Sequence, residues 1–107
     1  MENGIKKIGS VGVDSGQVII TDPCYLKGFE SNEFTASEEE VKKMQESGNF
    51  PYSYEGACAR TLSEQQAGEI GLGEQGVVSS SGFGDGEYPV YAEYSEGRVK
   101  ALRIVFF

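Results

Sequence analysis

The stretch of this sequence most able to do chemistry runs from Ser79 to Tyr91 and reads SSSGFGDGEYPVY. Three serines come first, and then three glycines alternate with other residues, so that successive backbone N–H groups could face an anionic ligand. The serine hydroxyls would add donors, and the two tyrosines that follow could stack on a base or on a peptide side chain. The stretch therefore predicts a ligand-binding loop.

The pattern does not match the common nucleotide-binding motifs. A Walker loop needs a Gly-Lys-Ser/Thr sequence and a dinucleotide-binding turn needs a following helix, whereas this stretch runs into a strand-like segment. A second interpretation also stays open, in which the stretch only connects two strands, because Asp-Gly is among the commonest turn dipeptides. The predicted ligand-binding residues are Ser80, Ser81, Gly82, Gly84, Asp85, Gly86, Tyr88 and Tyr91, with Asp22 and Tyr25 from an earlier turn.

Carboxylates offer another kind of chemistry. Asp85 and Glu87 flank Gly86, and Asp22 lies at the other conspicuous turn. If the two ends of the chain are neighbours, these groups could hold a divalent cation or act as acid and base. The calcium-loop pattern is missing, however, and a turn selects Asp-Gly for its own reasons. We therefore predict no metal, no cofactor and no catalytic residue, and keep a small carboxylate- or cysteine-dependent hydrolase as the alternative.

The chain has two cysteines and no histidine. The lack of histidine excludes Ser-His-Asp, Cys-His and histidine–metal arrangements within one chain. Cys24 follows a turn proline, but the nearby Asp22 disfavours the reactive thiolate. We expect Cys24 and Cys58 to be buried thiols, reduced in the cytoplasm and lacking the CxxC spacing of a redox or zinc site.

The charge is strongly acidic, with seventeen Asp and Glu residues against nine Lys and Arg residues and a net charge of −8. Such a surface repels nucleic acid and anionic lipid, and it favours a basic partner or simple solubility. No apolar run is long enough to span a bilayer, and the first residues lack the pattern of a signal peptide. We therefore expect a cytoplasmic protein that binds no membrane and does not bind nucleic acid directly.

The first half of the chain predicts a hairpin and a helix. Residues 6–13 and 17–21 carry apolar residues and are separated by Asp14-Ser15-Gly16, which predicts a β-hairpin. Residues 37–47 predict one short helix, because Ser37 and Glu40 have the spacing of a capping box and the glutamates fall in the first turn.

The second half predicts strands. Tyr52, Tyr54, Gly56 and Cys58 alternate as on one face of a strand, and the glycine-rich run 63–82, with apolar residues between 70 and 78, fits one or two more. Residues 88–94 alternate clearly and turn at 95–97, and the apolar end LRIVFF predicts a central strand anchored in the core. The expected fold is a mainly β, α+β domain spanning residues 1–107, with a single antiparallel sheet or small β-sandwich of about six strands.

Two segments also resemble known sequences. VDSGQVIITDPCYL and GFGDGEYPVYAEYSEGRVKALRIVFF are similar to segments of small uncharacterised bacterial and phage proteins. The second resembles the domain of unknown function 4241, whose members have a glycine turn, Tyr-Pro-Val, a charged turn and an Arg-Ile-x-Phe strand. The resemblance implies a β-rich core and no activity, and residues 27–76 take no part in it.

Together these observations favour a small acidic binding protein that is not an enzyme. It would sequester a small ligand, such as a signalling nucleotide, in the glycine-rich stretch, or present its acidic surface to a basic protein and block it. The resemblance to phage proteins suggests an anti-defence inhibitor as the setting. Self-association stays open.

Overall fold

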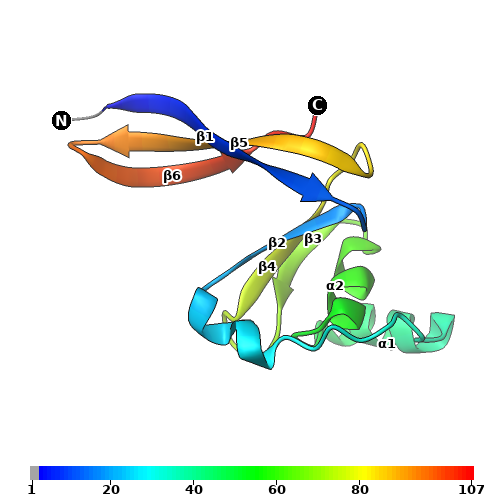
Figure 1. Ribbon diagram of the computed structural model, residues 1–107. Coiled ribbons are helices and arrows are strands. Elements are labelled where there is room, and N and C mark those ends of the chain that lie inside the picture. The colour runs from blue at the N-terminus through cyan, green and yellow to red at the C-terminus, as the bar shows by residue number, and fades with distance from the viewer. Residues whose placement is uncertain (1–2) are drawn as a thin grey trace. The chain divides into compact units, whose positions relative to one another are not determined.

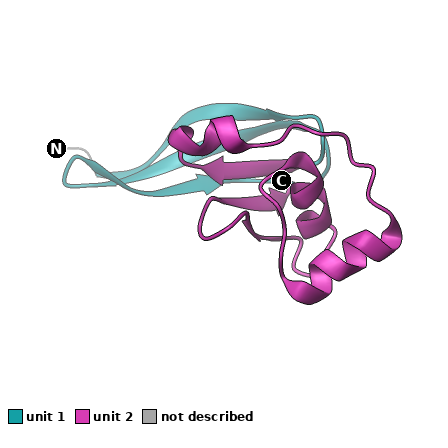
Figure 2. Cartoon of the chain, turned by 90° about the horizontal axis from the view of Figure 1, so that it is seen from below, with its two compact units in different colours: residues 1–16, 81–107 teal, residues 17–80 magenta. Residues whose placement is uncertain are grey.

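A computed structural model describes residues 3–107. The chain forms two compact units (Figure 1 and Figure 2). Unit 1 contains residues 3–16 and 81–107, and unit 2 contains residues 17–80. The chain therefore enters unit 2 after Gly16 and leaves it after Ser80. That the whole chain is a single domain stays a prediction.

Unit 1 is a three-stranded antiparallel sheet. Its strands are β1 (Gly4–Val13), β5 (Gly86–Ser95) and β6 (Arg98–Ile104), in the order β1-β5-β6. A tight turn at residues 96–97 joins β5 to β6, as the sequence predicts. The predicted central position of the C-terminal strand is wrong, because β6 is an edge strand and six of its seven residues are exposed. Apolar residues of the run LRIVFF instead form one row of side chains on β6, and Phe106 beyond the strand packs edge-on against Tyr88.

Unit 2 contains a second antiparallel sheet and its helices. The strands are β2 (Gln17–Thr21), β3 (Ala67–Ile70) and β4 (Gly76–Ser80), in the order β2-β4-β3. The helices are the short 3₁₀-helix η1 (Pro23–Gly28), α1 (Glu38–Ser47) and α2 (Tyr54–Thr61). α2 packs on β3 and β4, and α1 packs on α2.

Helix α1 confirms the capping-box prediction. The Ser37 hydroxyl accepts a hydrogen bond from the Glu40 backbone N–H at 3.2 Å, and the Glu40 carboxylate accepts one from the Ser37 backbone N–H at 3.3 Å. Gly48 ends the helix in the left-handed conformation, and its N–H donates to the Met44 carbonyl. These signals are local in sequence, so they could be identified without tertiary information.

Helix α2 contradicts the strand that alternation of Tyr52, Tyr54, Gly56 and Cys58 predicted. The Ser53 hydroxyl accepts the Gly56 N–H at 2.9 Å and caps a helix at this point. Gly56 is buried directly against the Pro51 carbonyl, where no side chain fits. The helix thus depends on a cap and on small residues that let it pack closely, and neither feature is visible in a period-two pattern.

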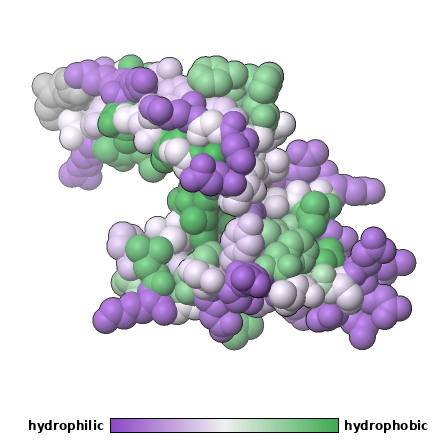
Figure 3. All heavy atoms as spheres, turned by 45° about the vertical axis from the view of Figure 1, so that its right-hand side comes forward, coloured by the Kyte–Doolittle hydropathy of each residue, from purple (hydrophilic) through white to green (hydrophobic). Residues whose placement is uncertain are grey.

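The main core lies in unit 2. Six buried residues form one cluster, and Phe29, Val41 and Met44 pack against it. The cluster consists of Phe50, Tyr52, Ala57, Ala59, Ile70 and Val78. Other large hydrophobic side chains are exposed in both units, and Figure 3 shows hydrophobic residues at the surface among hydrophilic ones.

The mainly β architecture with six strands agrees with the prediction for the described residues, but the single sheet and the N-terminal hairpin are wrong. Residues Asp14 to Gly16 do turn the chain, yet β1 pairs with β5 and β2 pairs with β4. The two strands therefore belong to different sheets. The β-sandwich alternative stays a prediction. Among residues 3–107, no helix is long and apolar enough to span a bilayer.

Candidate functional site

The glycine loop, residues 81–85, lies in unit 1 and is closed by its own hydrogen bonds. Ser81 is fully buried, its N–H donates to the Gly16 carbonyl at 2.8 Å, and its hydroxyl donates to the Gly84 carbonyl. The Gly84 N–H donates back to the Ser81 hydroxyl at 3.1 Å, and the Phe83 N–H donates to the Ser81 carbonyl at 2.7 Å. These donors already hold the loop in shape, so they do not form an open cradle for an anion.

The glycines of this loop serve the turn itself. Gly84 has a φ of +93°, a conformation that favours glycine, although a Cβ atom there would meet nothing within 4 Å. The loop does not close a hairpin, because β4 belongs to the sheet of unit 2 and β5 to the sheet of unit 1. Ser80 ends β4 and pairs with Gln17.

The two predicted stacking tyrosines differ in accessibility. Tyr88 is only 4% exposed, its hydroxyl donates to the Gly84 carbonyl at 2.7 Å, and its ring packs edge-on against Phe106. Its ring is therefore not available to a ligand. Tyr91 is half-buried and lies between Lys7 and Arg103 in the sheet register.

Asp22, Cys24 and Tyr25 lie in unit 2, at the start of η1. The Asp22 carboxylate accepts the Cys24 N–H at 2.9 Å, and this backbone hydrogen bond lowers the pKa of Asp22. Asp22 thus acts as a helix cap. Asp85 and Glu87 belong to the other unit, so nothing brings the three predicted carboxylates together within one unit.

The predicted burial of Cys24 is wrong, because its side chain is exposed, while Cys58 is half-buried. The predicted effect of Asp22 on the Cys24 thiol agrees with the structure. The Asp22 carboxylate, by accepting a hydrogen bond from the thiol and by its negative charge, raises the pKa of Cys24. An exposed position alone therefore does not make this cysteine a good nucleophile.

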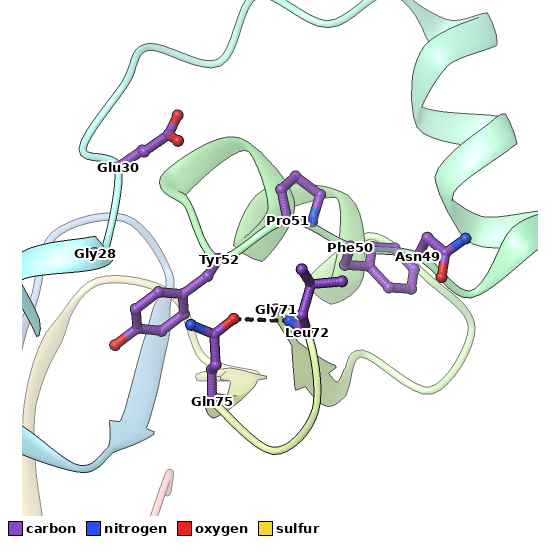
Figure 4. Close-up of a pocket in the computed structure, with 9 residues that line it drawn as sticks. All are labelled: Gly28, Glu30, Asn49, Phe50, Pro51, Tyr52, Gly71, Leu72 and Gln75. Carbon is purple, nitrogen blue, oxygen red and sulfur yellow. Dashed lines mark hydrogen bonds between the residues drawn. The ribbon is translucent and has the colours of Figure 1, made fainter. Parts of the chain in front are cut away.

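A pocket in unit 2 was not predicted from the sequence. It is open, has a volume of about 460 Å³ and is walled mainly by apolar side chains (Figure 4). Leu72, in the β3–β4 turn, is 92% exposed and extends toward Pro51. The lining residues are Gly28, Glu30, Asn49, Phe50, Pro51, Tyr52, Gly71, Leu72 and Gln75.

Hydrogen bonds fix one wall of this apolar pocket. The Thr21 hydroxyl donates its only proton to the Gln75 carbonyl at 2.7 Å, so Tyr52 must donate in the 2.7 Å bond that joins the two hydroxyls. The side-chain oxygen of Gln75 accepts the Leu72 N–H at 2.7 Å. Its amide nitrogen lies beside the Tyr52 ring (Figure 4).

A smaller hollow of about 230 Å³ adjoins the apolar pocket and shares Gln75 with it. Three carboxylates line this acidic hollow, those of Asp22, Glu69 and Glu74. Among residues 3–107 no three acidic, cysteine or histidine side chains are grouped closely enough to hold a metal ion. Ile20 and Val77 also line the hollow, so it combines apolar surface with three acidic residues.

Charge is distributed unequally between the units. Residues 17–80 contain four basic and eleven acidic residues, a net charge of −7, whereas the remainder contains five basic and six acidic residues, a net charge of −1. The pocket thus lies in the acidic unit, and its surroundings favour neutral or cationic ligands. Its three segments, around residues 28–30, 49–52 and 71–75, are distant in sequence, so only the glycine-flanked turn at Leu72 could have indicated it.

Searches of curated proteins and of solved structures found no match for this chain. One family model does match, over residues 3–104, and its description is "Protein of unknown function (DUF4241)". The match confirms the resemblance seen in the C-terminal segment, which includes most of the glycine loop, and extends it over the apolar pocket. The chain is a member of the DUF4241 family.

Proposed function

We propose that this protein is a non-enzymatic binding protein whose acidic unit takes a basic polypeptide segment of a partner. An apolar side chain of the partner enters the apolar pocket, and a neighbouring Lys or Arg side chain lies in the acidic hollow. The observation that carries this proposal is that the two cavities share Gln75, so that one short segment can reach both.

The size and walls of the apolar pocket support a side-chain ligand. Its volume of about 460 Å³ is within the range of about 300–1,000 Å³ that ligand sites have. Pro51 and Leu72 offer exposed apolar surface beside the buried rings of Phe50 and Tyr52, and Gln75 can donate a hydrogen bond to a peptide carbonyl. A mostly apolar wall with one oriented amide is typical of sites that hold an apolar group in a fixed direction.

Electrostatics favours a basic ligand over a nucleotide. Asp22, Glu69 and Glu74 line the hollow, and Glu30 lines the pocket. These carboxylates attract a Lys or Arg side chain and repel phosphate, which counts against sequestering a signalling nucleotide here. The glycine loop is no better suited to phosphate, because three of its N–H groups donate within unit 1.

The hydrolase alternative has less support. The best-placed nucleophile is Cys24, and the Asp22 carboxylate raises the pKa of its thiol, which lowers the thiolate fraction at neutral pH. Blocking a component of bacterial defence is one setting in which a protein of this kind would act, and that setting stays a prediction. In that setting or another, this protein would bind its partner through the partner's basic segment with an apolar side chain.

The test uses isothermal titration calorimetry with the full chain and short synthetic peptides. The first peptide has a central leucine flanked by lysines, the second has the lysines replaced by glutamate, and the third has the leucine replaced by serine. We expect the first peptide to bind and the other two to bind at least about tenfold more weakly. The serine peptide lacks the leucine, whose burial contributes about 1.5–3 kcal/mol, and the carboxylates of the acidic hollow repel the glutamate peptide.

A matched pair of variants locates the binding. Leu72→Ser alters the apolar pocket, whereas Leu26→Ser alters a leucine that is 55% exposed and lines neither cavity. We expect Leu72→Ser to bind the lysine–leucine peptide about tenfold more weakly than the parent and Leu26→Ser to bind it with unchanged affinity. The melting temperature of both variants should be unchanged. Equal affinity for all three peptides, or equal effects of both variants, would contradict the proposal.

A further inference from the structure

Unit 1 carries a second surface that the proposed function does not use, the free edge of β6. Among residues 3–107, the sheet order β1-β5-β6 leaves one side of the β6 backbone with no neighbouring strand in its sheet. Six of the seven β6 residues are exposed. Such an edge presents unpaired N–H and C=O groups that can add another extended segment.

The side chains of β6 form two chemically distinct rows. Residues directly paired across an antiparallel sheet share a face, and the register pairs Val99, Leu102 and Ile104 with Tyr94, Ala92 and Val90. One face of β6 is therefore apolar, and Val99 and Leu102 on it are 56% and 58% exposed.

The opposite row is basic. Arg98 and Arg103 pair with Ser95 and Tyr91 and thus lie on the other face. β6 has three basic residues, Arg98, Lys100 and Arg103, and no carboxylate, although the chain as a whole has a net charge of −8. Lys100 lies at a register shift and forms a 3.9 Å ion pair with Glu93 of β5, which leaves the two arginines to face an added strand.

The other edge of this sheet is a poorer docking strand. β1 has three glycines in its ten residues, Gly4, Gly9 and Gly12, whereas β6 has none; both strands have one register shift in their ladders with β5. β1 therefore offers fewer side chains to a partner than β6 does, and its side chains form no continuous apolar or basic row. The argument therefore concerns β6 alone.

We propose that β6 binds an extended segment of a partner protein that alternates apolar and acidic residues, by adding it as a fourth strand. Backbone hydrogen bonds join the strands, apolar residues of the partner continue the row of Val99 and Leu102, and carboxylates pair with Arg98 and Arg103. A second copy of this chain fits worse, because two β6 strands would bring arginines of both copies onto one face.

Basic residues on an edge strand also discourage aggregation, and the experiment separates that role from docking. The full chain is labelled with ¹⁵N and titrated with a capped peptide that alternates valine and glutamate, and then with one that alternates valine and lysine. We expect the amide resonances of β6 to shift saturably with the glutamate peptide, and the lysine peptide to bind about tenfold more weakly.

Charge reversal completes the test. The double variant Arg98→Glu with Arg103→Glu changes two exposed residues, and we expect it to keep its melting temperature and to prefer the lysine peptide. If it folds poorly, Arg103→Gln alone should reduce the preference. Leu72→Ser should bind the glutamate peptide like the parent, since Leu72 belongs to unit 2 and β6 to unit 1.

Three results would overturn the proposal. The first is that neither peptide shifts the β6 resonances, which would leave the arginines as protection against aggregation only. The second is that both peptides bind equally and charge reversal changes neither affinity. The third is concentration-dependent dimerisation of the parent chain with β6 amides protected from hydrogen exchange, because a second copy would then occupy the edge.

Discussion

The two units of this protein use alternating apolar residues in different ways. In unit 2, α2 packs on β3 and β4, and side chains such as Ile70 and Val78 are buried in one cluster. Unit 1 is a three-stranded sheet without a helix, and Val99 and Leu102 on its edge strand are more than half exposed. Unit 2 thus has a helix layer over its sheet and a cluster of six buried residues, whereas unit 1 buries Val13, Tyr88 and Ala92 but leaves β6 exposed.

The difference in charge follows the same division. Unit 2 carries −7 of the net charge of −8, whereas unit 1 is nearly balanced and has all five of its basic residues on the edge strands β1 and β6. We therefore propose a different class of partner for each unit. The proposed partner of the acidic unit is a basic segment with an apolar anchor, and that of the edge of β6 is an acidic extended segment.

The largest expected effect is on stability and compares the two units directly. Ile70→Ala removes a side chain that is 1% exposed in the core cluster, and we expect it to lower the free energy of unfolding by about 2–5 kcal/mol. Leu102→Ala on β6 should cost less than about 1 kcal/mol, because Leu102 is 58% exposed. Urea unfolding of both variants measures the contrast, and equal losses would show that β6 is packed as tightly as the core.

A smaller effect is expected in the glycine loop. Gly84→Ala should lower the free energy of unfolding by about 1–2 kcal/mol, because its φ of +93° is unfavourable for an L-residue. Gly9→Ala is the matched control, since a Cβ there also meets nothing within 4 Å and its φ is not positive. The control should be neutral or stabilising by about 0.4–1 kcal/mol.

The outcome for Gly84→Ala also tests the interpretation of the loop. If the loop only shapes the chain, the variant should lose stability and bind the lysine–leucine peptide like the parent. A loss of peptide binding at unchanged stability would instead revive the glycine loop as the ligand site.

The smallest expected effect concerns the exposed thiol. The Asp22 carboxylate raises the pKa of Cys24, so alkylation of this thiol by iodoacetamide should be slow at neutral pH. The alkylation rate should increase only at a higher pH than it does for an ordinary cysteine. Asp22→Asn removes the negative charge, so it should lower that pKa and increase the rate at pH 7. Mass spectrometry of the modified peptide follows the reaction, and an unchanged rate in the variant would contradict the role given to Asp22.

Parts of this fold could be predicted because their signals are local. The capping box of Ser37 and Glu40 predicts helix α1, and the alternation and turn around residues 95–97 predict β5 and β6. In each case the residues that decide the structure are neighbours in sequence.

Other parts depend on distant residues. β1 and β2 are separated by one short turn, yet their partners are β5 and β4, and no feature of residues 4–21 specifies that choice. α2 has the alternation of a strand, but the Ser53 cap and the close contact of Gly56 with Pro51 make it a helix. The apolar pocket follows from these long-range arrangements, since it collects three segments distant in sequence.

The most direct test of the account is to find which unit a basic, apolar peptide perturbs. Titration of ¹⁵N-labelled full chain with the lysine–leucine peptide should shift the amide resonances of Phe50, Tyr52 and residues 71–75 in unit 2, with no change in β6 or at residues 81–85. Shifts centred on residues 81–85, or no saturable shift in either unit, would contradict the claim that the acidic unit is the binding site.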